Sequence, residues 1–230
     1  MEWPALESDP KIFTDYFHKI GAPEDIKFVE LLSLESYQDF LIIEGDILGL
    51  ILNFSRKNKK PIDVSRLKSN DYVPFYMKQT PKLDNACGLI AGLHILGNAD
   101  NIEYNPEGFL KKFYESNKGK KPEEIAKSLE KDDTCKEAHH EAANEGQTNL
   151  ENTDVVYHYI GFIYKKGEII ELDGLKNGPY VIKDNVNKDD FIKVTSNEIL
   201  RRVREHEINE GINVMLLYDK RCFLTNLLEE

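Results

Sequence analysis

One cysteine of this sequence stands where a helix is expected to begin. In KLDNACGLIAGLHILGN, Cys87 follows a polar stretch, and Gly97-Asn98 ends the apolar run behind it. The apolar residues of that run recur at helical spacing: Leu89, Ile90, Leu93 and Leu96. Asp84 or Asn85 is expected to cap this amphipathic helix, which puts Cys87 in its first turn. The unpaired amides there favour a thiolate, the nucleophilic form of cysteine.

The alternative for any single cysteine is an inert buried thiol. Cys135 and Cys222 are given that interpretation by default. Cys87 becomes a candidate nucleophile only if a base and an orienting group accompany it.

A histidine and an aspartate could supply these two groups. His158 lies inside VVYHYIGFIY, an expected strand in which an unpaired imidazole would be costly to bury, and Asp173 ends the next expected strand, EIIELDG. The short KKG between the two strands predicts a hairpin. The alternative is a core histidine bonded to some carbonyl, with an unrelated aspartate in a turn.

The hairpin also predicts a register. If 165–167 is a three-residue turn with Gly167 in the left-handed position, Tyr164 faces Glu168 and His158 falls opposite Gly174. A bulge that shifts the pairing by one residue brings Asp173 beside His158. Neighbouring strands lie about 4.8 Å apart, so the carboxylate there reaches the imidazole.

Other short elements surround these candidates. A helix is expected in ESDPKIFTDYFHKIG, residues 7–21, with Ser8 or Asp9 as its cap and Pro10 in its first turn. A buried strand is expected over 46–54, a surface loop over 56–71, and helices in NPEGFLKKFYES and KPEEIAKSLEK. Polar residues up to 154 predict an exposed crossing loop. Thr195 and Glu198 have the spacing of a capping box before a helix, and INVMLLY predicts a last strand. Because helices and strands interleave without a linker, a single α/β domain over 1–230 is expected.

Composition limits the class of protein and its partners. The 230 residues are 40% apolar and 31% charged, with no apolar run that could cross a bilayer and no secretory signal at the start. Three cysteines without a CxxC pair indicate a reducing compartment, the cytosol or the nucleus. A net charge of −11 argues against nucleic acid and membrane surfaces as partners and favours a basic one.

Metal and cofactor sites are not indicated. Cys135 and His139 share a helix face at four-residue spacing, but a structural zinc site needs four ligands, so a solvated surface is the interpretation. No glycine-rich phosphate loop is evident, and neither a metal nor an organic cofactor is expected.

Taken together, these motifs resemble a known family. The segments KQT…NACG, HYIGFIY and ELDG are similar to those of the ubiquitin C-terminal hydrolases, which are papain-like thiol deubiquitinases. The resemblance covers nearly the whole chain: WPALESDP and KFVELLSLES look like the family's opening, HHEAANEGQTN like the segment before its crossover loop, and INVMLLY like its last strand.

The resemblance implies a role for each candidate. Cys87 is the nucleophile, His158 the general base, Asp173 the residue that orients it, and Gln79 the side chain that stabilises the oxyanion together with the Cys87 amide. One departure is the loop TPKLDNA between Gln79 and Cys87, which is two residues longer than in typical members. Either the extra residues bulge outward and Gln79 keeps its place, which we favour, or Asn85 takes over.

The resemblance further implies an α+β fold with a central antiparallel sheet flanked by helices, a knotted backbone, and a crossover loop near 147–153 over the active site. Ubiquitin is the implied substrate, and Glu7 and Glu30 resemble positions near its basic tail. The enzyme is expected to be a monomer that cuts after the last glycine of ubiquitin and releases small adducts or short peptides. Two alternatives remain: a hydrolase for a ubiquitin-like modifier such as NEDD8, and a catalytically weak ubiquitin-binding module.

Overall fold

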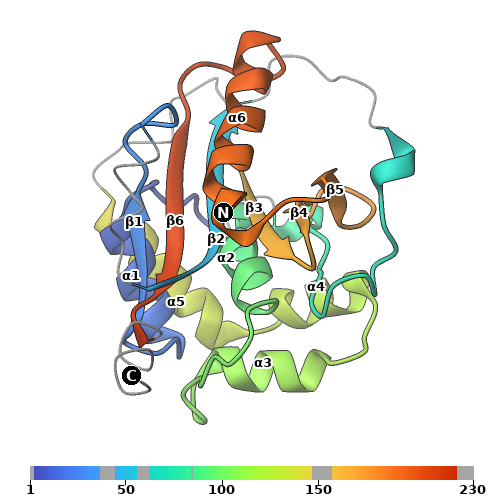
Figure 1. Ribbon diagram of the computed structural model, residues 1–230. Coiled ribbons are helices and arrows are strands. Elements are labelled where there is room, and N and C mark those ends of the chain that lie inside the picture. Colours follow the sequence, from blue (N-terminus) through green and yellow to red (C-terminus); the bar gives the residue numbers. More distant parts are fainter. Residues whose placement is uncertain (1–2, 37–44, 56–62, 84, 147–156, 222–230) are drawn as a thin grey trace, which may run out of the picture.

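The fold is built on one antiparallel sheet. The computed structural model describes residues 3–36, 45–55, 63–83, 85–146 and 157–221. Six strands pair in the order β1-β6-β2-β3-β4-β5 (Figure 1). Their bounds are β1 Ile26–Glu30, β2 Asp46–Ser55, β3 Tyr157–Lys165, β4 Glu168–Leu172, β5 Tyr180–Lys183 and β6 Asn213–Asp219. The pairings between these described strands are all antiparallel, as the resemblance implied for the sheet.

Both faces of the sheet are covered. Side chains alternate along a strand, and in β2 Leu50 and Leu52 enter one apolar cluster while Ile51 enters another. This explains why DILGLILNF reads as a continuous apolar run, as expected of a strand buried on both sides.

One cluster joins the sheet to five helices, with bounds α1 Pro10–Lys19, α2 Cys87–Leu96, α3 Phe109–Asn117, α4 Pro122–Glu130 and α5 Asp133–Glu145. The predicted amphipathic character of α2 is wrong, because every residue of this helix is buried. It packs on β2 and β3 on one side and on α1 on another. A Cβ at Gly92 would lie 2.1 Å from the Phe17 ring of α1, so the two helices approach closely at that glycine.

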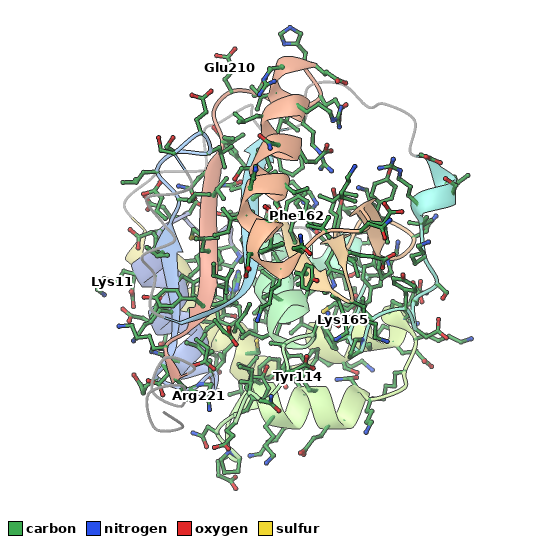
Figure 2. All side chains as sticks on the ribbon, viewed as in Figure 1. Lys11, Tyr114, Phe162, Lys165, Glu210 and Arg221 are labelled. Atoms are coloured by element: carbon green, nitrogen blue, oxygen red, sulfur yellow. The ribbon has the colours of Figure 1, made fainter. Side chains whose placement is uncertain are left out.

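The other face is covered by α6, Phe191–Arg204, which runs across the sheet in front of β2 and β3 (Figure 1). Figure 2 shows the side chain of Phe162 on β3 beneath this helix. The predicted capping box is wrong, because Thr195 and Glu198 lie inside α6. The Thr195 hydroxyl donates to the Phe191 carbonyl at 2.7 Å, and a short 3-10 turn, η5 Lys188–Asp190, leads into the helix instead.

The other predicted elements agree in part. Asp9 caps α1 and Pro10 is its first residue, but α3 begins at Phe109, three residues after Pro106. Strands β1 and β5 were not predicted.

The loop expected over 56–71 is described only from 63, and it contains the 3-10 turn η2 Val64–Arg66. The expected crossover loop, 147–153, lies outside the described residues. Among the helices that are described, none has the length and apolar character needed to span a membrane.

Candidate active site

Cys87 is the first residue of α2, as predicted, and it is buried. The predicted side-chain cap is wrong for Asn85, because the N-cap is Ala86 and no side chain bonds to it; Asp84 lies outside the described residues. The chain enters the helix through backbone bonds, with the Ala86 amide donating to Leu83 and the Ile90 amide to Ala86. Cys87 thus lies in the first turn, where amides lack partners within the helix.

His158 and Asp173 meet directly. The Nε2 atom of His158 lies 2.8 Å from Oδ1 of Asp173, and both side chains are buried. The predicted hairpin register is wrong, because Tyr164 pairs with Ile169, so the turn has two residues. Lys166 and Gly167 both have positive φ, which is typical of a tight two-residue turn. The ladder ends at Gly161 and Leu172, and one step further Asp173 is a diagonal neighbour of His158 on the same face.

The electrostatics of this pair hold a proton on the imidazole. Burial alone would lower the pKa of His158, but the hydrogen bonds and charges of Asp173 and Cys87 outweigh it and raise the pKa to about 9. Burial works against ionised Asp173 as well, yet His158 and the Lys176 ammonium hold the pKa of this carboxyl far below its usual range. Cys87 therefore faces an imidazole that is protonated at neutral pH.

Gln79 reaches the same region from a separate segment. Its backbone amide donates to the Gly174 carbonyl at 2.9 Å, directly after Asp173. In the longer loop TPKLDNA, residues Pro81–Leu83 form the 3-10 turn η3, in which Leu83 is buried and Pro81 and Lys82 are exposed. The outward bulge that we expected for the extra residues fits this arrangement.

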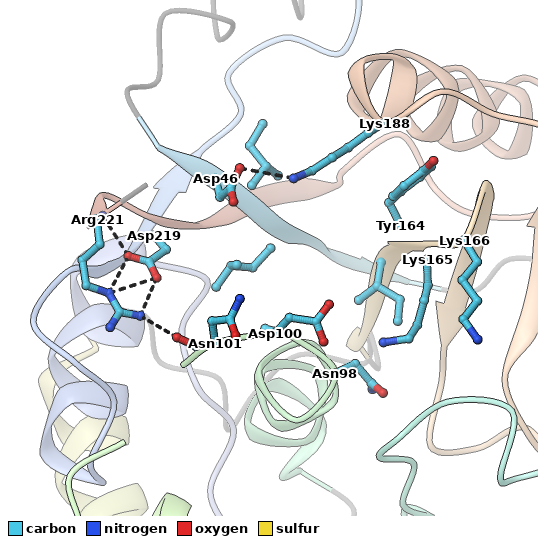
Figure 3. A pocket seen from close by; sticks show the side chains of 14 residues that line it. Asp46, Asn98, Asp100, Asn101, Tyr164, Lys165, Lys166, Lys188, Asp219 and Arg221 are labelled. Carbon is cyan, nitrogen blue, oxygen red and sulfur yellow. Dashed lines mark hydrogen bonds and ion pairs between the residues drawn. The ribbon is translucent and has the colours of Figure 1, made fainter. Parts of the chain in front are cut away.

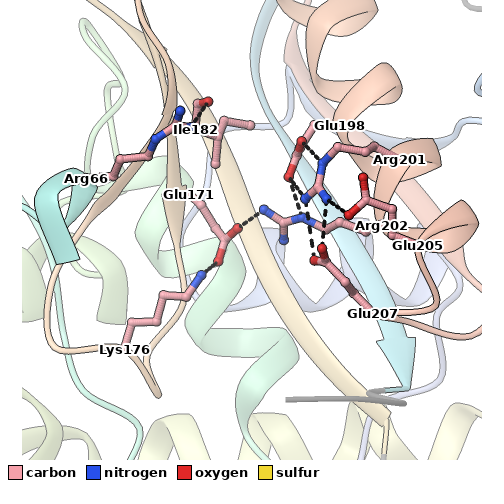
Figure 4. A network of polar contacts seen from close by, with 9 residues as sticks. All are labelled: Arg66, Glu171, Lys176, Ile182, Glu198, Arg201, Arg202, Glu205 and Glu207. Carbon is pink, nitrogen blue, oxygen red and sulfur yellow. Dashed lines mark hydrogen bonds and ion pairs between the residues drawn. The ribbon is translucent and has the colours of Figure 1, made fainter. Parts of the chain in front are cut away.

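A buried ion cluster supports the turn after Asp173 (Figure 4). Glu171 on β4 is ion-paired with Lys176 and, at 2.6 Å, with Arg202 of α6. These three side chains are 1%, 12% and 11% exposed, so their charges are compensated almost out of contact with water. This cluster was not predicted; the signal for it in the sequence was the glutamate Glu171 within the apolar strand EIIELDG.

Hydrogen bonds link the segments that carry Glu7 and Glu30. Asn213 of β6 connects their segments, because it accepts from the hydroxyl of Ser8 at 2.7 Å and donates to Glu30 at 2.5 Å. Burial raises the pKa of Tyr159, and the charges of Cys87 and Glu7 add to this shift. The charges of Glu7 and Cys87 therefore both raise the pKa of the same side chain, the phenol of Tyr159.

Cys135 and His139 are not on a solvated surface, so that interpretation is wrong. Both are buried, because this face of α5 packs on α1. The Tyr16 hydroxyl lies 3.6 Å from the Cys135 sulfur and 3.3 Å from Nδ1 of His139. Burial raises the pKa of the Cys135 thiol to about 12, which agrees with an inert cysteine. Cys222 lies outside the described residues.

A hollow of about 800 Å³ lies away from these residues (Figure 3). Cys87, His158, Asp173 and Gln79 are not among the residues that line it. Its charges pair with one another, with Lys188 3.2 Å from Asp46 and Arg221 2.7 Å from Asp219. The candidate catalytic residues therefore do not line this hollow.

The geometry defines a class of protein. A cysteine in the first turn of a buried helix, beside an imidazole bonded to a carboxylate, is the arrangement of a cysteine-type hydrolase.

Comparison with known proteins identifies the family. Residues 3–204 match the model of the family described as ubiquitin carboxyl-terminal hydrolase, family 1, and the chain belongs to that family. It is a thiol-dependent ubiquitin carboxyl-terminal hydrolase. A ubiquitin carboxyl-terminal hydrolase from Aplysia californica is 32% identical over 83% of this chain and 90% of its own length. The isozyme L1 from Monodelphis domestica is 30% identical over 91% of this chain and 95% of its own.

Solved structures share the fold. The UCH37 of Trichinella spiralis, bound to ubiquitin vinyl methyl ester, superposes with a TM-score of 0.72 at 20% identity, covering 96% of this chain and 84% of its own. Its catalytic domain alone gives a TM-score of 0.70 at 22% identity, covering 94% and 95%. The fold is therefore the α+β fold of this family, with its central antiparallel sheet flanked by helices.

Proposed function

We propose that Cys87, His158 and Asp173 form the catalytic triad of this hydrolase and that Gln79 and the Cys87 amide stabilise the oxyanion. The observation that carries the proposal is the 2.8 Å bond between His158 and Asp173, with Cys87 acting on the same imidazole. Because Nε2 of His158 bonds to Asp173, Nδ1 is the ring nitrogen that interacts with the Cys87 sulfur.

Each step of the reaction then has a group in place. The thiolate attacks the carbonyl carbon of the last glycine of the modifier, and the oxyanion that forms accepts hydrogen bonds from Gln79 and the Cys87 amide. Removing one such donor typically costs about 10²–10³ in rate. The imidazolium gives its proton to the leaving amine as the C–N bond breaks, which leaves a thioester. Neutral His158 then takes a proton from water, and the attacking hydroxide releases the carboxylate product and restores the thiolate.

Ubiquitin is the substrate that we propose, with small adducts or short peptides as leaving groups. The Trichinella spiralis structures similar to this chain hold a ubiquitin derivative, which supports that choice. Glu7 and Glu30 are the residues that we propose for contact with the basic tail of ubiquitin, and the link from Ser8 through Asn213 to Glu30 supports a common location for them. We further propose a single monomeric catalytic domain in which residues 147–153 cross the active site and the backbone is knotted.

Replacing the nucleophile tests the assignment. Cys87→Ala should lower the hydrolysis of a ubiquitin C-terminal fluorogenic amide by about 10⁴-fold or more while ubiquitin still binds, because the attacking atom is lost. Cys135→Ala is the matched control, and it should retain activity because that thiol is inert. An electrophilic ubiquitin probe followed by mass spectrometry should label Cys87.

Two results would contradict this assignment. Robust turnover by Cys87→Ala would remove this residue from the mechanism, and a label on another residue would move the site. Binding of ubiquitin by the unaltered protein without any reaction with the probe would favour the binding module. Faster cleavage of the corresponding NEDD8 amide would instead change the substrate.

A further inference from the structure

The segment that leads to Gln79 carries a buried tyrosine outside the triad. The side chain of Tyr76 is 2% exposed. Its hydroxyl donates to two backbone carbonyls on the turn after β4, that of Asp173 at 2.8 Å and that of Lys176 at 2.7 Å. One hydroxyl thus contacts both ends of the turn that carries the Asp173 carboxylate.

The ring of Tyr76 is fixed on its other side by α2. It stacks on His94 with a centroid distance of 5.1 Å and an interplanar angle of 2°. Nε2 of His94 lies 3.1 Å from both the amide nitrogen and the carbonyl oxygen of the next residue, Met77. Burial lowers the pKa of His94 to about 4, so this imidazole is neutral at neutral pH. Tyr76 therefore connects the helix that begins at Cys87 with the Asp173 turn.

The contact between the two segments continues along the chain. Nζ of Lys78 donates to Oδ1 of Asn177 at 3.2 Å, and the Gln79 amide donates to Gly174 at 2.9 Å. A Cβ at Gly174 would lie 2.9 Å from the Gln79 nitrogen, so the backbones nearly touch. Lys78 and Gln79 are only partly buried, which leaves Tyr76 as the buried contact of this row.

We propose that Tyr76 is a positioning residue for catalysis, whose hydroxyl holds the 173–176 turn against α2 so that Asp173 stays in line with His158. The inference rests on the proposed roles of Cys87, His158 and Asp173. The carboxylate projects from a turn just beyond the end of β4, where the strand ladder no longer restrains it. Without the hydroxyl, the turn keeps its own bond from the Lys176 amide to the Asp173 carbonyl but loses the two bonds by which Tyr76, stacked on His94 of α2, holds it.

Tyr76→Phe removes only the hydroxyl. We expect kcat on the ubiquitin amide to fall about tenfold with KM within about twofold, because small displacements of a catalytic group mainly reduce the rate of the chemical step. Tyr114→Phe is the matched control, because it removes a partly buried hydroxyl that donates to the carbonyl of Leu93 in α2 at 2.9 Å. Both variants should lose roughly 2–4 °C in melting temperature, but only Tyr76→Phe should lose activity.

Two further readouts separate positioning from plain stability. An NMR titration should give a lower pKa for His158 in Tyr76→Phe than in the unaltered protein or in Tyr114→Phe. In an Asp173→Asn background, Tyr76→Phe should cost little further activity, because Tyr76 acts through Asp173. An unchanged His158 pKa, or losses that add in full, would overturn the proposal. The titration needs no substrate, so it tests Tyr76 even if ubiquitin proves to be the wrong substrate.

Discussion

At the scale of single residues, the central feature is an imidazole that stays charged although it is buried. His158 is 7% exposed, and a neutral ring would be expected at such a site without a partner. Asp173 and Cys87 reverse that tendency and raise the pKa to about 9. An acid that is still protonated at neutral pH can give its proton to a departing amine.

The raised pKa predicts how activity depends on pH. In the unaltered enzyme, kcat/KM should fall as the pH rises through about 9, because His158 then loses the proton that the leaving group needs. Asp173→Asn should lower kcat/KM roughly 100-fold or more and move this limb toward about 6.5, the ordinary value for histidine. Initial rates on the ubiquitin amide between about pH 5 and 10 measure both effects. A limb that stays near pH 9 in the variant would show that Asp173 does not control His158.

The same shift links protonation to folding. Since the folded state raises the pKa of His158 above 6.5, the protonated ring stabilises the fold fully below that pH, and this contribution is lost as the pH rises through about 9.

Residue types predicted the candidate site better than they predicted its geometry. Cys87 was placed at a helix start, and His158 with Asp173, from spacing alone. The register was missed because it depends on the positive φ of Lys166, which a lysine rarely adopts. The cap was missed because the chain enters α2 through backbone bonds that no side-chain pattern reveals.

At the scale of elements, the 173–176 turn depends on a buried charge. Lys176 of the turn pairs with Glu171, which is buried on β4. Burial would raise the pKa of Glu171, but Arg202 and Lys176 lower it, so this carboxylate stays ionised between β4 and α6. The cluster ties a helix on one face of the sheet to the turn that presents Asp173. Patterns of apolar periodicity do not reveal it, because they carry no information on which charges meet.

Glu171→Gln should be costly for stability. The change leaves Lys176 and Arg202 buried without their counter-charge, and we expect the free energy of unfolding to fall by about 3 kcal/mol. Urea unfolding measures the loss. Asp15→Asn is the control, because its pair with Lys11 on α1 is exposed to solvent and should contribute little to the free energy of unfolding. Equal losses in the two variants would mean that the buried cluster does not support the fold.

Short elements were also the hardest to predict. Strands β1 and β5 have five and four residues, too few for an alternating pattern to stand out. Thr195 and Glu198 had the right spacing for a cap, but Thr195 bonds back to Phe191 within α6 and Glu198 pairs with Arg201 and Arg202. For Thr195 and Glu198, contacts formed in the folded protein determined the structure, and the spacing of the two residues in the sequence did not reveal them.

At the scale of the whole molecule, the net charge of −11 bears on how a basic tail arrives. Glu7 and Glu30 are the acidic residues that we propose for contact with this tail. Ser8, the residue after Glu7, bonds to Asn213, which in turn bonds to Glu30, so the segments that carry the two glutamates are linked.

Removing one of these charges should show in the salt dependence of the rate. Glu7→Gln should lower kcat/KM several-fold at low ionic strength, and the difference should shrink in about 0.5 M salt, where charges are screened. Glu115→Gln, on the exposed side of α3, should have little effect at either salt concentration. Equal effects of the two variants would mean that Glu7 has no special contact with the substrate.

The resemblance anticipated the antiparallel sheet and its helices, whereas the strand order could not be read from apolar patterns. Those patterns identify strands one at a time and say nothing about which strand lies beside which. The observed order places β6 between β1 and β2.

That order has a consequence for how the protein is made. Among the described strands, Asn213–Asp219 is synthesised after the other five, and it separates β1 from β2 and bonds to both. Until the ribosome has released these residues, β1 lacks the strand with which it pairs and this side of the sheet stays open. We therefore expect a nascent chain to remain catalytically silent until residues 213–219 have emerged.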